Sequence, residues 1–302
     1  MKRTLSITLC SLTILLTRSL LSQVTTDPPF QLPDNVVLKT DVVYGKGGDR
    51  DLKADLFLPK KTSASRPAIV FIHGGGWSGG NRRAFYRQAA HFASAKGYLG
   101  MCIEYRLSGE AKFPAAVEDS KCAVRWLRAN AADYQIDPNR IAACGGSAGG
   151  HLAAMLGVTD KSANLEGKGG HASFSSRVNL VIDFNGPSDL APLVASGRAT
   201  TPVVQFLGAT PEQNRELYRQ ASPITYVDQK APPFLFLHGT ADATVPIEQS
   251  RTLLKKLRDA GVEAEIYEAD GAGHGFFNRP PFYEPTLKRM QEFLDRHFGS
   301  RI

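Results

Sequence analysis

Short apolar runs alternate with longer amphipathic segments along most of the chain. The apolar runs have the length of strands, and several are apolar at every position, as expected for strands covered on both faces. The segments between them carry apolar residues at helical spacing. This alternation predicts an α/β fold with a mostly parallel sheet and helices on both faces. The expected parallel strands are residues 68–72, 99–105, 140–144, 180–184, 234–237 and 263–268.

The segments between these runs predict five helices and a hairpin. Residues 36–44 and 51–58 alternate in part and are separated by a glycine-rich turn, which predicts a β-hairpin. The hairpin adds two antiparallel strands at one edge, so eight strands are expected in one sheet. The expected helices are residues 82–96, 114–130, 148–158, 247–260 and 283–298.

Two segments interrupt the alternation. Residues 160–177 are rich in Gly, Ser and Lys, which predicts a surface loop. Residues 186–233 contain a loop and two short helical patterns, near 203–207 and 212–220. A long irregular segment inside a compact domain is typical of a lid or a substrate-binding insert, and we expect that role here.

The first 22 residues differ from the rest of the chain. Lys2 and Arg3 precede an apolar stretch over residues 5–16, which predicts a secretory signal peptide that ends near Ser22. A short N-terminal extension, residues 23–36, follows. The apolar stretch is too short for a comfortable membrane span, so no stable span is expected in the mature chain. We therefore expect a secreted or periplasmic protein, with an uncleaved N-terminal anchor as the alternative.

Composition and charge narrow the function classes. Hydrophobic residues make up 42% and charged residues 22%, as in an ordinary globular protein. Loss of residues 1–22, with three basic groups, lowers the formal net charge from +7 to +4, and no dense Lys/Arg run remains, so a nucleic-acid partner is not expected. The remaining Cys102, Cys122 and Cys144 are odd in number and are expected to be buried free thiols. No pattern specifies an oligomeric state.

A serine stands in a turn that suits a nucleophile. Residues 145–149 read Gly-Gly-Ser-Ala-Gly and match G-x-S-x-G between an expected strand and an expected helix, which is the context that this motif requires. A serine on such a tight turn needs small neighbours two residues away on each side. The N-terminus of the next helix favours negative charge that develops at the site. Ser147 is the candidate nucleophile, and a purely structural glycine turn is the alternative.

A second glycine-rich loop follows the strand at 68–72. Residues 73–77 read His-Gly-Gly-Gly-Trp, and glycines let backbone N–H groups approach a reacting carbonyl. We expect an oxyanion hole built from the N–H groups of Gly75, Gly76 and Ala148, in which one donor stabilises the transition state by about 3–4 kcal/mol. A phosphate-binding loop would need a Lys-Ser/Thr ending, which is absent here. His73 is expected to support the loop.

A serine hydroxyl needs a general base and a group that orients it. His274 lies in a glycine-rich loop after the last expected strand, and Asp242 lies in the loop after the strand before it. Loops at the carboxyl ends of parallel strands form the active-site crevice, so we expect His274 as base and Asp242 as the acid that fixes its tautomer. The competing acids are Glu248, Glu268 and Asp270.

Metal chemistry is not indicated. The histidines lack H-x-x-x-H spacing on one helix, and the cysteines lack C-x-x-C spacing. No metal and no cofactor are expected.

These blocks resemble the α/β-hydrolase serine esterases of the hormone-sensitive-lipase-like group, and most closely the bacterial carbohydrate esterases of the acetylxylan and feruloyl esterase type. The resemblance implies an α/β-hydrolase catalytic domain over residues 37–302, with nucleophile, acid and base in the chain order that this fold uses. It covers residues 37–298 and rests on residues 72–77, 104–107, 113–116 with Asp119, 145–151, and the loops of Asp242 and His274.

The resemblance also implies a substrate class. Lipases of the group usually carry a long N-terminal helical cap, whereas only about a dozen mature residues precede the first strand here; residues 108–110 read Ser-Gly-Glu where Ala-Pro-Glu is frequent. A small cap implies an open site, which suits an ester carried on a polymer. The expectation is a serine carboxylesterase that hydrolyses short-acyl or feruloyl esters of plant polysaccharide. We expect Trp77 and Phe276 to contact the substrate.

Three other functions stay open at this point. The first two are a peptidase of the prolyl-oligopeptidase kind and an amidase similar to arylformamidases. The third is a degenerate hydrolase that acts as a binding module. Such peptidases usually carry a propeller domain, and degenerate hydrolases commonly lose the serine or the histidine, both of which this chain keeps.

Overall fold

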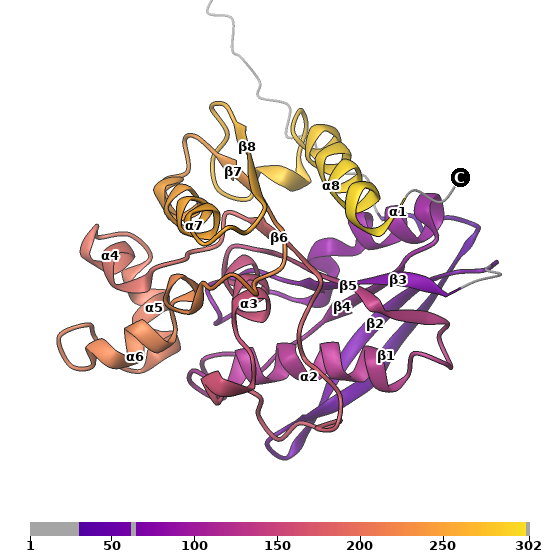
Figure 1. The fold of residues 1–302 in the computed structure, drawn as a ribbon, viewed down its shortest axis with the longest axis horizontal. Helices are drawn as coiled ribbons and strands as arrows, with labels where there is room; N and C mark the ends of the chain where they lie inside the picture. Colours follow the sequence, from indigo (N-terminus) through magenta and orange to yellow (C-terminus); the bar gives the residue numbers. More distant parts are fainter. Residues whose placement is uncertain (1–29, 62–64, 300–302) are drawn as a thin grey trace, which may run out of the picture.

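Eight strands form one twisted sheet in the computed structural model, which describes residues 30–61 and 65–299 (Figure 1). The strands are β1 (Val36–Gly47), β2 (Arg50–Pro59), β3 (Arg66–Ile72), β4 (Leu99–Ile103), β5 (Ile136–Gly146), β6 (Leu180–Phe184), β7 (Phe234–Gly239) and β8 (Ala264–Ala269). Their order is β1-β2-β4-β3-β5-β6-β7-β8. β2 pairs antiparallel with β1 and β4, and the other neighbours are parallel. The predicted hairpin and mostly parallel sheet are confirmed.

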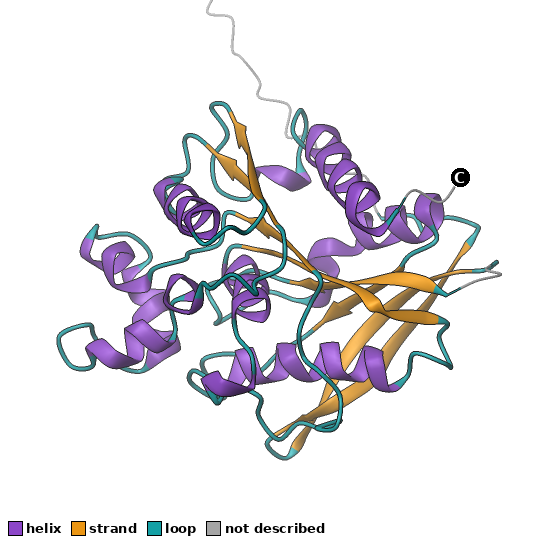
Figure 2. Ribbon diagram, viewed as in Figure 1, coloured by secondary structure: helices purple, strands orange, loops and turns teal. Residues whose placement is uncertain are grey.

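Helices cover both faces of the sheet (Figure 2). The α-helices are α1 (Tyr86–Lys96), α2 (Ala115–Ala129), α3 (Ala148–Val158), α4 (Leu190–Ala195), α5 (Thr200–Leu207), α6 (Arg215–Gln220), α7 (Glu248–Asp259) and α8 (Tyr283–Phe298). Short 3₁₀ helices are η1 (Arg82–Phe85), η2 (Lys161–Ala163), η3 (Pro223–Tyr226) and η4 (Phe276–Asn278). α1 and α8 cover one face, and α2, α3 and α7 cover the other. All five predicted long helices are present, the first of them split into η1 and α1.

The central strands are buried on both faces. In β3, Ala68, Val70 and Ile72 join the hydrophobic core beneath α2 and α3. Their neighbours Ile69 and Phe71 join the second core, beneath α1 and α8. Because each strand feeds two apolar cores, no polar residue alternates along it, which is why these runs are apolar throughout.

The insert between β6 and β7 forms its own small group of helices. α4, α5, α6 and η3 lie together beyond the edge of the sheet, at the left of Figure 1. α5 and α6 correspond to the two predicted short helices. α4 is an additional helix of six residues that buries Leu190 and Leu193. Six residues span fewer than two turns, too few for a helical period to show in the sequence.

The polar segment between α3 and β6 covers buried cations of α2. The side chain of Lys121 is fully buried, and its Nζ donates to Glu166 Oε1 at 2.9 Å. Arg125 Nη1 donates to the other oxygen of the same carboxylate at 2.8 Å. The prediction of a plain surface loop is therefore only partly right, because Glu166 anchors the loop to two charges that would otherwise be buried without a counterion.

Other sequence predictions fall partly outside the described residues. The predicted signal peptide and most of the predicted extension lie in residues 1–29, which the structure does not describe. In residues 30–61 and 65–299, no helix has the length and apolarity needed to cross a bilayer. Cys102, Cys122 and Cys144 are buried free thiols, as predicted.

Candidate active site

The three candidate side chains of the triad meet at one edge of the sheet. Ser147 follows β5, Asp242 lies in the loop after β7, and His274 lies in the loop after β8. Nε2 of His274 lies 2.9 Å from Ser147 Oγ. Nδ1 of His274 lies 2.7 Å from Asp242 Oδ2. The structure thus brings a hydroxyl, an imidazole and a carboxylate into one hydrogen-bonded chain.

The turn that carries Ser147 depends on its glycines. The serine has φ 56° and ψ −120°, in the positive-φ region that residues with a side chain rarely adopt. A Cβ on Gly145 would collide with the carbonyl oxygen of Gly149, and a Cβ on Gly149 would collide with that of Ile72. The N–H of Ser147 donates to Phe184 O at 2.8 Å. Close packing of the backbone thus forces the turn and holds it against the neighbouring strand.

The carboxylate of Asp242 is satisfied on both oxygens. Oδ1 accepts the backbone N–H groups of Thr244 at 2.8 Å and Val245 at 2.9 Å. Oδ2 accepts from His274 and lies 3.4 Å from Nε2 of His238. Burial alone would raise the pKa of Asp242, but the hydrogen bonds from the two histidines outweigh it and hold the pKa well below its usual range. The ionised acid keeps the proton of His274 on Nδ1, which leaves Nε2 free to accept a proton.

His238 supports the acid loop. It is fully buried, with Nε2 2.9 Å from Val245 O and Nδ1 2.7 Å from Ser250 Oγ. A carbonyl oxygen only accepts, so Nε2 carries the proton and Nδ1 accepts from the serine hydroxyl. The Nε2–H group therefore points at both Val245 and Asp242. No sequence pattern indicates this role, because an isolated histidine at a strand end carries no signal for it.

The competing acids have other partners. Glu248 and Glu268 pair with Arg251 at 3.3 Å and 2.7 Å. Asp270 is exposed and accepts from the Thr240 hydroxyl at 3.2 Å. Asp242 is thus the carboxylate that the structure places on the histidine.

The predicted oxyanion loop borders the same cavity as Ser147. Gly75 and Gly76 have φ +112° and +58°, and both line the cavity together with Ala148. A Cβ on Gly75 would collide with the carbonyl oxygen of Gly79. The carbonyl of Gly75 accepts the N–H groups of Ser78 at 3.1 Å and Gly79 at 3.0 Å, so the loop closes on itself. Glycine is required because the loop combines positive φ with a close backbone approach.

His73 supports this loop from behind, as predicted. Its Nδ1–H donates to Gly74 O at 2.7 Å, and its ring stacks on Tyr105 at 4.4 Å. The Tyr105 hydroxyl donates to His73 O at 3.1 Å. Burial lowers the pKa of His73, so the ring is neutral at pH 7.

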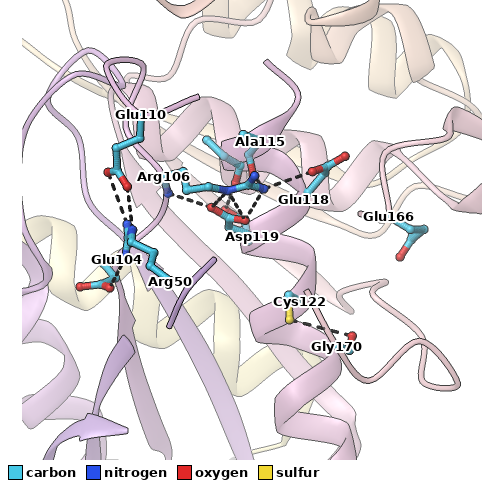
Figure 3. Close-up of polar contacts among 12 residues, drawn as sticks. Arg50, Glu104, Arg106, Glu110, Ala115, Glu118, Asp119, Cys122, Glu166 and Gly170 are labelled. Atoms are coloured by element: carbon cyan, nitrogen blue, oxygen red, sulfur yellow. Dashed lines mark hydrogen bonds and ion pairs between the residues drawn. The ribbon is translucent and has the colours of Figure 1, made fainter. Parts of the chain in front are cut away.

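An ion pair between Arg106 and Asp119 fixes the segment that follows β4 (Figure 3). Nη2 of Arg106 lies 2.7 Å from Asp119 Oδ1, and the Arg106 N–H donates to Oδ2 at 2.8 Å. Glu118 adds a contact to the same guanidinium at 3.2 Å. The N–H of Ser108, in the same segment, donates to Trp77 O at 2.7 Å. The residues in 104–119 that resemble esterase motifs therefore support the glycine-rich loop at residues 73–77.

A cavity of about 530 Å³ lies above Ser147, with walls that are mainly apolar. Trp77 forms part of one wall and stacks on Phe206 of the insert at 4.5 Å. Phe85 and Phe277 form part of another wall and stack on each other at 5.4 Å. The insert contributes Ala199 and Pro202 to the lining.

The two predicted substrate contacts have different outcomes. Trp77 lines the cavity, with its Nε1–H donated to His151 Nδ1 at 3.2 Å. Phe276 is not part of the lining; it is buried edge-on against Phe277 and Phe282. Successive residues of the tight η4 turn point in different directions, and Phe277 is the one that faces the cavity. The cavity lining thus includes Phe277 and not Phe276.

Asn185 is a site residue that the sequence analysis missed. It follows β6 directly, is fully buried and lines the cavity. Its Nδ2 lies 3.0 Å from Nδ1 of His274. A signal was available, since a polar residue directly after a parallel strand lies at the same sheet edge as Asp242.

The described parts of the chain contain no group of three or more His, Cys, Asp or Glu side chains arranged for a metal ion.

Comparison with known proteins assigns the family. The family model described as BD-FAE matches residues 54–257, more than half of the chain. The chain belongs to the BD-FAE family. This BD-FAE member is 35% identical to Esterase LipC of Mycobacterium tuberculosis over 70% of its own length and 53% of the relative's. It is 34% identical to Esterase LipQ of the same organism, over 87% of this chain and 63% of that one. The chain thus spans less than two thirds of the length of these curated relatives.

Two similar solved structures match this BD-FAE member over more than nine tenths of their own length. The esterase Est2 of Thermogutta terrifontis is 34% identical with a TM-score of 0.75, over 88% of this chain and 94% of that one. A truncated carbohydrate esterase from gut microbiota is 31% identical with a TM-score of 0.72, over 86% of this chain and 98% of that one. A bifunctional GH43-CE protein of Bacteroides eggerthii is 35% identical with a TM-score of 0.78, over 86% of this chain and 38% of that one. These likenesses confirm the α/β-hydrolase fold and the resemblance to esterases of this group.

Proposed function

We propose that this BD-FAE family member is a serine carboxylesterase. The single observation that carries the proposal is the hydrogen-bonded chain from Asp242 through His274 to Ser147, at the base of an apolar cavity. Such a chain turns a weakly nucleophilic hydroxyl into an attacking group at neutral pH.

The proposed reaction has two halves. Ser147 Oγ attacks the ester carbonyl carbon while Nε2 of His274 takes the hydroxyl proton. The tetrahedral intermediate collapses, the C–O bond to the alcohol breaks, and His274 gives the proton to the departing oxygen. Water then attacks the acyl-enzyme by the same route and releases the acid. Asp242 stabilises the imidazolium that forms in each half.

The oxyanion of both intermediates needs donors that are already in place. Gly75, Gly76 and Ala148 border the cavity beside Ser147, and we assign their N–H groups to this role. The N-terminus of α3, which begins at Ala148, adds a favourable dipole.

We also propose short-acyl or feruloyl esters on plant polysaccharide as substrates. The cavity is modest in volume and apolar, which suits a small uncharged acyl group, and its aromatic walls suit a phenolic ring. Structures of the similar Thermogutta esterase are described with propionate and with butyrate bound, and a similar chain from gut microbiota is described as a carbohydrate esterase. Secretion, predicted from residues 1–22, belongs to the same proposal, since polymers do not enter cells.

A substrate panel tests the proposal. We expect acetate or ferulate release from acetylated or feruloylated xylan, little release from a long-chain triglyceride, and little cleavage of prolyl peptides or aryl formamides. Preference for the triglyceride would contradict the substrate class. Preference for an amide would contradict the esterase assignment.

Active-site labelling separates an enzyme from a binding module. A fluorophosphonate probe is expected to label the wild-type protein. Ser147→Ala is expected to abolish labelling and His274→Ala to slow it strongly. A folded wild-type protein that takes up no label would favour the binding module.

A further inference from the structure

The backbone of Asn185 is held between the strands that carry the nucleophile and the acid. The N–H of Asn185 donates to Leu237 O on β7 at 3.0 Å. The preceding residue, Phe184, accepts the N–H of Ser147 at 2.8 Å. Asn185 is therefore fixed relative to both neighbouring active-site loops.

The conformation of Asn185 is one that few residues adopt. Its φ is +44°, in the left-handed region where asparagine is enriched among residues with a side chain. Strained backbone of this kind persists where the surrounding structure enforces it, and it clusters at functional sites. Here the strain aims a fully buried side chain at His274.

The contact with His274 has an unusual direction. Nδ2 of Asn185 lies 3.0 Å from Nδ1 and 3.5 Å from Nε2 of the ring. If Nδ2 lay along the N–H direction of one ring nitrogen, it would be much farther from the other ring nitrogen. If Nδ2 lay in the ring plane at these two distances, it would overlap Cε1 of the imidazole. The amide therefore lies against the flat side of the imidazole, and the Nδ1–H group stays free to serve Asp242.

The side-chain amide of Asn185 contributes little to the stability of the fold. Within the described part of the chain, Asn185 Oδ1 is buried without a hydrogen-bond partner. A buried polar group without a partner destabilises a fold, and apolar side chains of similar size would avoid that cost. A strained, partly unsatisfied amide in contact with the general base points to a role in the reaction.

We propose that Asn185 is a positioning residue, a neutral amide that holds the ring of His274 in the plane that joins Ser147 Oγ to the Asp242 carboxylate. The inference rests on the proposed function of these three residues. Without the amide the ring is free to tilt away from one partner. With a carboxylate in its place, the imidazolium form is stabilised, so at a given pH a smaller share of the rings is neutral and able to accept the serine proton.

Two variants separate the amide from the backbone. Asn185→Gly retains the left-handed backbone and removes only the side chain. We expect kcat for p-nitrophenyl acetate to fall about 10- to 100-fold, because small misplacements of reacting groups have effects of this size, with KM within about twofold. The control is Asn179→Gly at the opposite end of β6, where the side chain accepts Ile141 N–H at 3.1 Å; its kcat is expected to match wild type.

Asn185→Asp tests the charge with almost no change in shape. A carboxylate against the ring favours the imidazolium, so the acidic limb of kcat/KM is expected to move to higher pH by about one unit or more. The ring otherwise faces Asp242 and Ser147. Asp183 on β6 and His238 on β7 are the other titratable groups of these strands, and both stay unchanged in every variant.

Wild-type kcat in Asn185→Gly would overturn the inference, as would an unmoved acidic limb in Asn185→Asp. If the glycine variant fails to fold, the pH profile of the near-isosteric aspartate variant decides alone. A wild-type protein that neither takes up the fluorophosphonate nor cleaves p-nitrophenyl acetate would instead overturn the proposed function itself.

Discussion

Replacing Asp242 with asparagine is expected to reverse the hydrogen bond with His274, to remove the contact with the Nε2–H group of His238, and to keep the two backbone hydrogen bonds of the acid loop. Oδ1 accepts the N–H groups of Thr244 and Val245 at 2.8 and 2.9 Å, and an amide oxygen accepts both equally well. The amide nitrogen then occupies the place of Oδ2 and points its hydrogens at Nδ1 of His274. Because a donor cannot bond a donor, the imidazole proton moves to Nε2 and Nδ1 becomes the acceptor.

The size of the effect follows from the 2.9 Å contact between Nε2 and Ser147 Oγ. Once Nε2 carries the proton, the serine has no base, and the imidazolium also loses the carboxylate 2.7 Å from Nδ1. A wrong tautomer of this kind lowers kcat about 10⁴-fold, or about 5.5 kcal/mol of activation free energy. The fold depresses the pKa of Asp242, so the ionised acid stabilises the protein at neutral pH and the variant is expected to unfold at a somewhat lower temperature there.

The assay is steady-state hydrolysis of p-nitrophenyl acetate by Asp242→Asn, with thermal unfolding to show that the variant is folded. Asp270→Asn is the matched control, because this exposed acid bonds only the Thr240 hydroxyl among the contacts described and its loss should leave kcat unchanged. More than a tenth of the wild-type kcat in Asp242→Asn, or an equal loss in Asp270→Asn, would refute the assignment of the acid.

Three further predictions concern Asp183, Gly75 and the three buried cysteines. Burial raises the pKa of Asp183 from 3.8 to about 6, so ionisation of this carboxyl destabilises the fold as the pH rises through that range. Asp183→Asn is therefore expected to raise the free energy of unfolding in urea by about 3 kcal/mol at pH 8, with no gain below about pH 4. An equal gain at both pH values would contradict this reasoning. Gly75→Ala is expected to lower kcat at least about 100-fold. Gly109→Ala is the control, since a Cβ at Gly109 meets open space and its kcat should match wild type. A fully active Gly75→Ala variant would rule out the assigned oxyanion loop. The buried Cys102, Cys122 and Cys144 are expected to resist a thiol reagent until unfolding, and rapid labelling of Cys122 would show that the covering loop at Gly169 opens in the native state.

Local patterns in the sequence were sufficient to predict the eight strands, the five long helices and the loops that carry the chemistry. The central strands β3 and β4 could be predicted because a strand covered on both faces is apolar throughout, and this property depends only on neighbouring residues. The glycines around Ser147 were readable for the same reason, since the turn excludes side chains at close range. The carboxyl-end rule for parallel strands then placed Asp242 and His274 at one edge.

Tertiary structure alone decided which side chains meet. Phe277 rather than Phe276 faces the cavity, Glu166 anchors a polar loop to buried Lys121, and Asn185 contacts His274. These contacts join residues tens of positions apart or depend on which way a short turn points its side chains. His274 and Ser147 are 127 positions apart in the chain. The contact between their side chains is therefore set by the order, register and packing of the strands between them and not by any local pattern.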